Sequence, residues 1–174
     1  MLVRTVGAHE TALCSTLGDL VVRAYVALPG HVDEPDYEKE LADVAGRAAA
    51  ASTVVFAAID DDGTPLGCAT YVDSPASPMA EGLAGDEAGM RMLGVDPGAQ
   101  GRGAGRALVS ACVDAAVAAR RSALCLHTTP WMTGAHRLYE AVGFARDPDR
   151  DWVPVPGIPL LGYRLDLSSS NHAR

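Results

Sequence analysis

The sequence predicts a single α/β domain (α+β in the broad sense), in which helices flank a mixed central sheet. Three observations support this fold class. Helical and strand-like hydrophobic periods alternate along the chain, two β-branched apolar segments flank a polar turn at 60–65, and a strand, a glycine-rich turn and a helix follow one another over 90–119. Because 174 residues match one domain with a full core, we expect one domain over 1–168 and a disordered tail at 169–174.

The first third of the chain predicts one edge strand and two helices. Residues 2–7 alternate weakly between apolar and polar, as in a short edge strand. Residues 11–27 carry leucines and valines at helical spacing, which indicates an amphipathic helix that ends before Gly30. Pro35 opens a second helix with acidic residues near its positive N-terminal end, and the apolar stripe of this helix runs to Ala48.

The middle of the chain predicts a hairpin, a loop and a third strand. Residues 53–59 are β-branched and apolar, the turn at 60–65 contains Asp, Gly and Pro, and 66–72 form the partner strand. Residues 74–88 are rich in Pro, Ala, Gly and Ser and predict a loop. A strand over 90–95 follows it.

The last third of the chain alternates helices with short strands. We expect a helix over 103–119, a strand over 123–128, a helix over 133–142, a strand starting at 143–145, a polar, Pro-rich excursion over 147–159, and a last strand over 160–167. The predicted order is therefore β-α-α-β-β-β-α-β-α-β-β. No internal repeat interrupts it.

Composition narrows the function classes. The formal net charge of −8 argues against nonspecific nucleic-acid binding, which relies on dense Lys/Arg patches, and slightly favours cationic substrates. The first residues lack the apolar run of a signal peptide, and no apolar stretch reaches the roughly 20 residues that span a bilayer. We therefore expect a cytoplasmic protein that binds a small molecule or peptide, with neither nucleic acid nor membrane as partner.

The four cysteines indicate structural thiols. Their spacing contains no CxxC pair and no Cys/His arrangement typical of a metal site, so we expect no bound metal. Most of them lie in apolar segments, where a free cysteine behaves as a small hydrophobic residue. We expect buried, reduced side chains at Cys14, Cys68, Cys112 and Cys125.

The glycine-rich turn at 100–105, with the sequence QGRGAG, is the strongest candidate for a binding motif. Its three glycines let the backbone turn tightly, and the helix that follows offers unpaired N–H groups and a dipole that attract an anion such as pyrophosphate. A flexible turn entering a helix remains the simpler alternative. The turn lacks the Gly-Lys-Ser/Thr of a P-loop, and its glycines do not fit the spacing of the Rossmann fingerprint.

Two sequence blocks resemble the GNAT (Gcn5-related) N-acetyltransferase superfamily. The turn at 100–105 looks like the family signature Q/R-x-x-G-x-G/A, and residues 90–97 look like the splayed strand that precedes it. Residues 135–144 are similar to the family block A-x-x-L-Y-E-x-x-G-F. The resemblance is strong over 88–146 and consistent in element order over the whole chain.

The resemblance implies a GNAT fold, with a mostly antiparallel central sheet and a splayed strand. It also implies direct transfer of an acetyl group from acetyl-CoA to an amine, in a ternary complex and without a covalent acyl-enzyme. A GNAT-like module that senses acyl-CoA without turnover is the alternative, and dimers among similar proteins suggest a homodimer. The cofactor-binding residues implied are Leu93, Gly94, Val95, Gln100, Gly101, Arg102, Gly103, Ala104, Gly105, Arg106 and Thr133. Thr133 has a helix cap as its structural alternative.

The catalytic candidates are Tyr139 and Glu87. Tyr139 lies where the family commonly places a phenol near the cofactor sulfur, which suits a general acid that protonates the departing thiolate. The base is less clear, because Gly89 occupies the position where the resemblance would place a Glu. Glu87 lies two residues earlier and shares that face only if the strand extends so far. His127 and a water relay to backbone carbonyls remain open as alternatives, the relay being the leading one.

The acceptor pocket is the least patterned part of the sequence. The family builds it from variable N-terminal helices, so the candidates there are Tyr25, His31 and Tyr37. His127 and Trp131 are further candidates from the second half of the chain. Trp152 and Tyr163, in the expected C-terminal hairpin, are more simply explained by core packing.

Overall fold

The structure is a computed structural model that describes residues 1–167, so the predicted tail at 169–174 lies outside the described residues. Eight strands and five α-helices form the described part of the chain. In chain order they are β1 (Leu2–Val6), α1 (Thr11–Val26), α2 (Pro35–Ala42), α3 (Val44–Ala49), β2 (Thr53–Ile59), β3 (Pro65–Val72), β4 (Ala88–Val95), α4 (Ala104–Ala118), β5 (Ala123–Thr128), α5 (Thr133–Val142), β6 (Ala145–Arg146), β7 (Trp152–Val155) and β8 (Ile158–Asp166).

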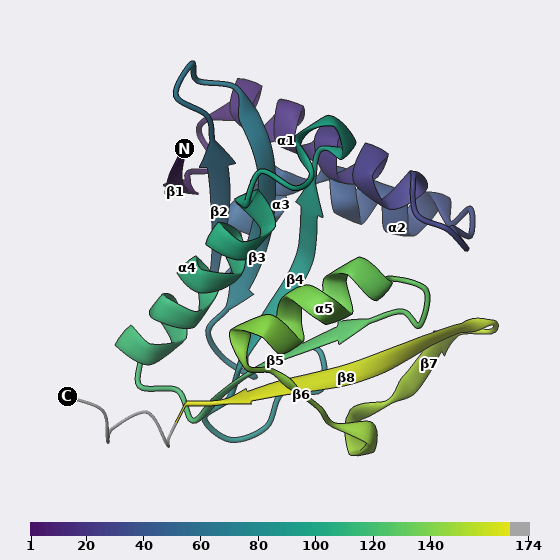
Figure 1. Cartoon of the computed structure of the whole chain (residues 1–174). Coiled ribbons are helices and arrows are strands. Elements are labelled where there is room, and N and C mark those ends of the chain that lie inside the picture. The colour runs from purple at the N-terminus through teal and green to yellow at the C-terminus, as the bar shows by residue number, and fades with distance from the viewer. Residues whose placement is uncertain (168–174) are drawn as a thin grey trace.

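The strands form one sheet with the order β1-β2-β3-β4-β5-β8-β6, and β7 pairs with β8 beside this path. All neighbouring strands are antiparallel except β4 and β5, which are parallel. The parallel pairing covers only two residue pairs, Ala88 with Leu124 and Gly89 with Cys125. Beyond these pairs the two strands diverge, which confirms the mixed, mostly antiparallel sheet with a splayed strand (Figure 1).

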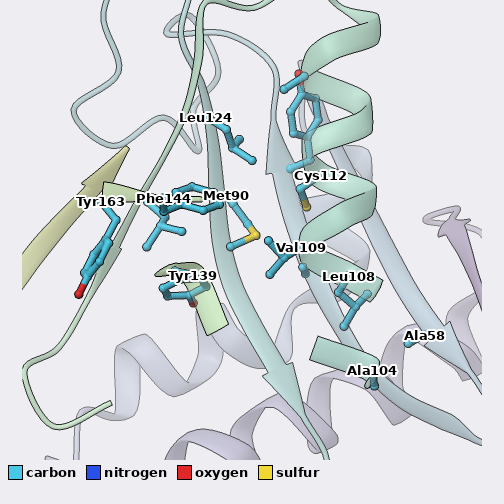
Figure 2. Close-up of a cluster of buried hydrophobic side chains, with 14 of the residues drawn as sticks. Ala58, Met90, Ala104, Leu108, Val109, Cys112, Leu124, Tyr139, Phe144 and Tyr163 are labelled. Atoms are coloured by element: carbon cyan, nitrogen blue, oxygen red, sulfur yellow. The ribbon is translucent and has the colours of Figure 1, made fainter. Parts of the chain in front are cut away.

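The helices cover both faces of the sheet, so the core has two layers. Helices α4 and α5 lie on one face, and α1 to α3 lie on the other (Figure 1). Alternate residues of β2 serve the two layers, because Val55 and Ala57 pack with α1 whereas Phe56 packs toward α4. Figure 2 shows part of the α4 layer, which continues into the aromatic side chains of Tyr139, Phe144 and Tyr163.

A bulge in β4 changes which face its side chains serve. The pairing of β3 with β4 shifts between Cys68 and Thr70, and opposite this shift Met92 adopts a positive φ of 53°. Met90 packs in the α4 layer, as alternation requires, but Met92 packs in the α1 layer and Leu93 returns to the α4 layer. Arg91 and Met92 therefore both serve the face covered by α1 and α2, where the pocket described below lies.

The second predicted helix is wrong in one respect, since it is two helices. Asp43 separates α2 from α3, and its carboxylate accepts a hydrogen bond from Gly46 N (2.8 Å), which caps the new helix. The buried Arg47 guanidinium secures the junction by donating to the Leu41 carbonyl (2.9 Å) and to the Thr70 hydroxyl (3.1 Å). Apolar periodicity runs through both helices, so it does not reveal the break.

Other element predictions need smaller corrections. The excursion predicted for 147–159 contains a 3₁₀ turn at Pro148–Arg150 and the strand β7. The strand predicted over 90–95 is β4, which begins at Ala88 rather than at residue 90. The hairpin of β2 with β3, the strand β5 and the helix α5 lie where the sequence predicts them.

All four cysteines are free and buried, as predicted. Burial raises the pKa of the Cys68 and Cys125 thiols to about 11 and that of Cys112 to about 12, so these side chains stay protonated at neutral pH. Along residues 1–167, no helix combines the length and the apolar character that a membrane span requires.

Candidate active site

The divergence of β4 from β5 creates the site. After Gly89 and Cys125 the two strands are no longer paired, although β4 stays bonded to β3 up to Val95. The edge of β4 that faces β5 therefore carries backbone groups without a strand partner. A pocket of about 300 Å³ opens beside this gap, and Leu93, Thr128 and Tyr139 are among its lining residues.

A loop at the end of β4 leads into the N-terminus of α4. Gly101 and Gly103 have φ values of 78° and 87°, a conformation that disfavours other residues, and nothing lies within 4 Å of where their Cβ atoms would be. Gly103 is the N-cap of α4, and no side chain caps this end. The first amides of the helix, starting at Ala104, therefore point outward without an intrahelical acceptor, which is the arrangement that binds a phosphate-type anion.

The side chains of this loop serve other purposes. Arg102 forms an ion pair with Asp60 in the β2–β3 turn, and Arg106 donates to the Ala141 carbonyl at the end of α5 (3.1 Å). A Cβ at Gly105 would lie 3.2 Å from the Leu138 side chain, so this glycine also lets α5 pack closely on α4. Gln100 is exposed. What the loop offers an anion is thus its backbone rather than its arginines.

The remaining predicted cofactor residues divide between strand and helix. Leu93 lines the pocket, and Gly94 lies against α1, where a Cβ would come within 3.2 Å of Val21. Val95 packs toward the α4 layer. Thr133 is the first residue of α5, and the helix has no side-chain cap, so the capping role considered for this hydroxyl is wrong.

The pocket brings together all five residues predicted for the acceptor. They come from α1, the α1–α2 loop, α2, β5 and the turn before α5: Tyr25, His31, Tyr37, His127 and Trp131. Carboxylates of Glu34, Glu38, Glu40 and Glu81 also line it, whereas Arg91 is the one arginine among its lining residues. The pocket is therefore acidic with aromatic walls, which suits a cationic ligand.

The rim of the pocket holds one arrangement with metal-ligand geometry among residues 1–167. His31, Asp33 and Glu38 each place one potential ligand atom within 4.8 Å of the others. His31 Nε2 lies 3.5 Å from a Glu38 oxygen, so these two side chains face each other directly. We assign no metal to this group.

Tyr139 reaches the same pocket from the opposite face of the sheet. Its ring is buried, 4% exposed, between Phe144 and Tyr163, with centroid distances of 5.9 and 6.1 Å. Burial raises the pKa of the Tyr139 phenol well above its ordinary value, so the group remains a neutral O–H donor. Within the described residues its hydroxyl has no hydrogen-bond partner, which leaves it available to a ligand in the pocket.

Glu87 lies in a different environment from the one a base requires. It precedes the first residue of β4, is 8% exposed and does not line the pocket. Its carboxylate contacts Arg150 (2.5 Å) and Arg164 (2.7 Å) and accepts a hydrogen bond from Ala84 N (3.1 Å). These contacts give Glu87 a structural role that joins the β3–β4 loop to the C-terminal strands.

Several polar or aromatic residues of the pocket were not predicted as site residues: Glu34, Glu38, Glu40, Glu81, Arg91 and Trp152. Glu81 Oε2 lies 3.2 Å from Arg91 Nε and 3.8 Å from His127 Nδ1. Trp152 meets the His127 ring edge to face at 6.4 Å and is 44% exposed, so the core packing expected for it is wrong. Tyr163 is buried, as expected for packing. Glu81 stands in a loop of low complexity, where no sequence pattern marks it.

Comparisons with known proteins agree with this fold. A model described as the acetyltransferase (GNAT) family matches residues 18–144. The solved structure of yncA, a putative acetyltransferase from Salmonella typhimurium with its cofactor acetyl-CoA, is similar with a TM-score of 0.66 at 21% identity, covering 100% of this chain and 96% of that one. No curated protein matches the sequence.

Two further structures show the same fold. A GCN5-related N-acetyltransferase from Kribbella flavida has a TM-score of 0.69 at 22% identity, covering 95% of this chain and 97% of its own. The ribosomal-protein-S18-alanine N-acetyltransferase from Escherichia coli has a TM-score of 0.68 at 20% identity, covering 99% and 97%. Since the family model spans well over half of the chain, from α1 to the end of α5, this protein belongs to the acetyltransferase (GNAT) family.

Proposed function

We propose that this acetyltransferase moves an acetyl group from acetyl-CoA directly to an amine of a small molecule or peptide, with both substrates bound at once. The observation that carries the proposal is the gap between β4 and β5. A loop with free helix-terminal amides lies at the end of β4, and an acidic pocket opens beside the gap. The two substrates could thus meet without a covalent acyl-enzyme.

The backbone of the loop fits the phosphates of the acyl donor. Amides from Gly101 to Arg106 would hold the pyrophosphate, since Gly103 leaves open space where a side chain would stand. Leu93, Gly94 and Val95 would flank the pantetheine arm along the unpaired edge of β4. When bound, acetyl-CoA supplies the acetyl group as an activated thioester.

Tyr139 is the group we assign to the departing sulfur. Tyr139 lines the pocket, and its neutral hydroxyl, unpaired within residues 1–167, can donate a proton or a hydrogen bond to a thiolate. Its ring is fixed by Phe144 and Tyr163, so the hydroxyl is already oriented before substrate binds. Glu87 is not retained in this scheme, because two arginines occupy its carboxylate.

The pocket supports an acceptor that is positively charged before it reacts. Four carboxylates and one arginine line it, so an ammonium group is attracted there. Similar structures include an aminoglycoside 6'-acetyltransferase and a ribosomal-protein-S18-alanine N-acetyltransferase, whose acceptors differ widely. We therefore propose the charge of the acceptor and leave its carbon skeleton to experiment.

The decisive experiment is a turnover screen with acetyl-CoA and a library of amines, detected by release of free thiol. Amine-dependent thiol release, with acetylated product identified by mass spectrometry, is the expected result. A chain that binds acetyl-CoA but turns over none of the amines would instead behave as the acyl-CoA-sensing module. Neutral alcohols and thiols at the same concentration serve as controls for transfer to other nucleophiles.

Assembly and location are further proposals. We propose a homodimer through the C-terminal hairpin, because Trp152 and Val153 leave large apolar side chains exposed on β7. Light scattering at micromolar concentration should give twice the chain mass, and a clean monomer mass would reject the dimer. We also propose a cytoplasmic location, since four buried free thiols suit a reducing compartment.

A further inference from the structure

We propose that His127 takes the proton from the acceptor's ammonium group and that Glu81 holds the resulting positive charge. This inference rests on the proposed function and assigns the base that it leaves open. A primary amine with a pKa near 10 is roughly one part in a thousand neutral at pH 7, so a group in the pocket must remove its proton. Both side chains line the pocket.

The tautomer of the neutral His127 ring follows from its contact with the backbone carbonyl of Arg150. Nε2 lies 2.9 Å from the Arg150 carbonyl oxygen. A carbonyl oxygen can only accept, so Nε2 carries a hydrogen and the lone pair of the neutral ring lies on Nδ1. The ring nitrogen that is free to accept a proton is thereby specified.

The position of the Arg150 carbonyl is itself fixed by packing. Gly162 of β8 is the strand partner of His127, and a Cβ on it would come within 2.5 Å of the Arg150 side chain and 2.8 Å of the Asp147 carbonyl. The missing side chain lets the 3₁₀ turn lie directly on β8. The Arg150 guanidinium then binds Glu87 (2.5 Å) and the Gly82 carbonyl (3.0 Å), so the turn is held on both sides.

Nδ1 of His127 faces another acceptor. Glu81 Oε2 is 3.8 Å from Nδ1. While the ring is neutral, both atoms are hydrogen-bond acceptors, so no hydrogen lies between them. A donor nitrogen placed about 2.9 Å from each atom would bond to both, and an ammonium group has the three hydrogens needed. The pair is therefore arranged to hold a cation, and the pocket provides access to it.

Glu81 already has one cationic neighbour in the protein, Arg91. Arg91 contacts Glu81 through Nε (3.2 Å), and Nη1 of the same guanidinium donates to the Met79 carbonyl (3.2 Å). Trp152 packs against the His127 ring, and the His127 side chain is 6% exposed. The charged groups near the ring are thus Glu81 directly, Arg91 behind it and Asp151, with Arg150 contributing its backbone carbonyl.

The location of His127 suits the reaction. It stands two residues beyond Cys125, the last residue of β5 that pairs with β4, so it lies where the gap opens. Arg91 occupies the matching place on β4, two residues beyond Gly89. Tyr139 reaches the pocket from the α5 side, so a base and an acid lie on opposite sides of the sheet.

The proton count balances with these two groups. The ammonium gives one proton to His127 Nδ1, and the neutral nitrogen attacks the thioester carbonyl carbon. The N–C bond forms, the C–S bond breaks, and the nitrogen's second surplus proton ends on the sulfur through Tyr139. His127 releases its proton to water after the products leave, so the net change is one proton released for each acetyl group transferred.

The first test compares two histidines with the same bonding. His136 Nε2 also lies 2.9 Å from a backbone carbonyl, that of Thr129, but His136 does not line the pocket. His127→Gln keeps a donor for the Arg150 carbonyl and removes the Nδ1 lone pair. We expect it to lower kcat on an ammonium acceptor at least about 100-fold, as loss of a general base does. His136→Gln should stay within about threefold.

The second test changes the acceptor instead of the enzyme. An aromatic amine that is already neutral at pH 7 needs no base to remove a first proton, so the defect of His127→Gln should shrink at least tenfold on it. Glu81→Gln should show the same selectivity with a smaller loss. Calorimetric affinity for acetyl-CoA should remain within threefold of wild type in both variants.

A spectroscopic readout is independent of turnover. Long-range ¹H–¹⁵N NMR of the wild-type protein should show the neutral His127 ring with hydrogen on Nε2, and a hydrogen on Nδ1 would overturn the assignment. Equal losses of the folded His127→Gln variant on both kinds of amine, or near-wild-type activity, would also overturn it. Absence of turnover by the wild-type chain on every amine would reject the proposed function instead.

Discussion

The two sides of the gap offer different groups to a ligand. The side formed by the end of β4 and the loop into α4 offers backbone groups, and its arginines contact Asp60 and the Ala141 carbonyl of the protein itself. The pocket beside α1 and α2 offers side chains from these two helices, from α5, from four strands and from the loops between them, including four carboxylates and several aromatic rings. In the proposed function, the first surface would recognise charge and shape common to a cofactor. The second can change residue by residue.

This difference has a consequence for mutation. A backbone site is insensitive to most side-chain changes and vulnerable where a residue without a Cβ is required. Substitutions in a side-chain pocket leave the protein folded but change which acceptor fits. Variants should therefore separate cleanly into those that change affinity for acetyl-CoA and those that change the acceptor, with Tyr139 belonging to neither class.

Apart from the variants of His127 and Glu81, the largest effect is expected for Tyr139→Phe. The change removes the donor and keeps the ring, so we expect kcat to fall roughly tenfold to a few hundredfold, toward the low end of general-acid contributions. Affinity for acetyl-CoA should stay within about threefold. Tyr163→Phe is the matched control, because its hydroxyl contacts Glu140 (3.3 Å). Near-wild-type kcat for Tyr139→Phe, where chemistry limits turnover, would make Tyr139 a packing residue.

The next effect concerns the backbone surface. Gly103→Val should weaken acetyl-CoA binding tenfold or more, about 1.4 kcal/mol, by blocking the approach of the pyrophosphate to the amides. A β-branched residue at a φ of 87° also costs folding stability, so a control with equal strain is needed. Gly157→Val supplies it, since Gly157 has a φ of 86° and the same open space in the β7–β8 turn. Calorimetry on folded proteins that gives equal affinities for both variants would contradict the cradle.

A smaller effect should appear in the acceptor pocket. Tyr37→Ala removes an aromatic ring that meets Tyr25 edge to face at 6.1 Å on the pocket wall. The acceptor KM should rise about three- to tenfold, in line with the loss of one aromatic contact, while the Kd for acetyl-CoA is unchanged. Lys39→Ala changes an exposed residue of the same helix that pairs with Asp36, and it should leave both constants unaltered. A changed Kd for acetyl-CoA in Tyr37→Ala, with no such change in Lys39→Ala, would contradict the separation of the two surfaces.

The smallest effect belongs to an ion pair that joins the two sides. Arg23 of α1 contacts Asp96 at 3.0 Å and, with the Gly98 amide, lowers the pKa of that carboxyl below its ordinary 3.8. A lowered folded-state pKa stabilises the protein above the ordinary value, and the stabilisation is lost as pH falls through the lowered one. Arg23→Gln should cost about 0.5 kcal/mol or less at pH 7, because both side chains are partly exposed. Denaturant unfolding should show this difference narrowing toward pH 3, and a widening difference would contradict the assignment.

Sequence reasoning succeeded where one local pattern determines the structure. The glycine-rich turn, the hairpin before it and the helix carrying Tyr139 each depend on residues close together in the chain, and their bounds were predicted within a residue or two. The break at Asp43 was missed because one side-chain cap interrupts an apolar stripe that continues across it. Glu81 was missed because its role depends on Arg91 and His127, which lie on two other segments. Spacing along the sequence does not predict contacts between distant segments of this kind.

The open edge of β4 has a consequence for hydrogen exchange. Outside the bulge at Met92, β4 is bonded to β3 from Met90 to Val95 on one side, yet beyond Gly89 it has no neighbour on the β5 side. Amides that face β3 should be protected whether or not a ligand is present, whereas amides that face the gap should exchange quickly in the free protein. Bound acetyl-CoA should slow only the second group. One strand would thus report sheet stability and ligand occupancy separately, from alternate residues.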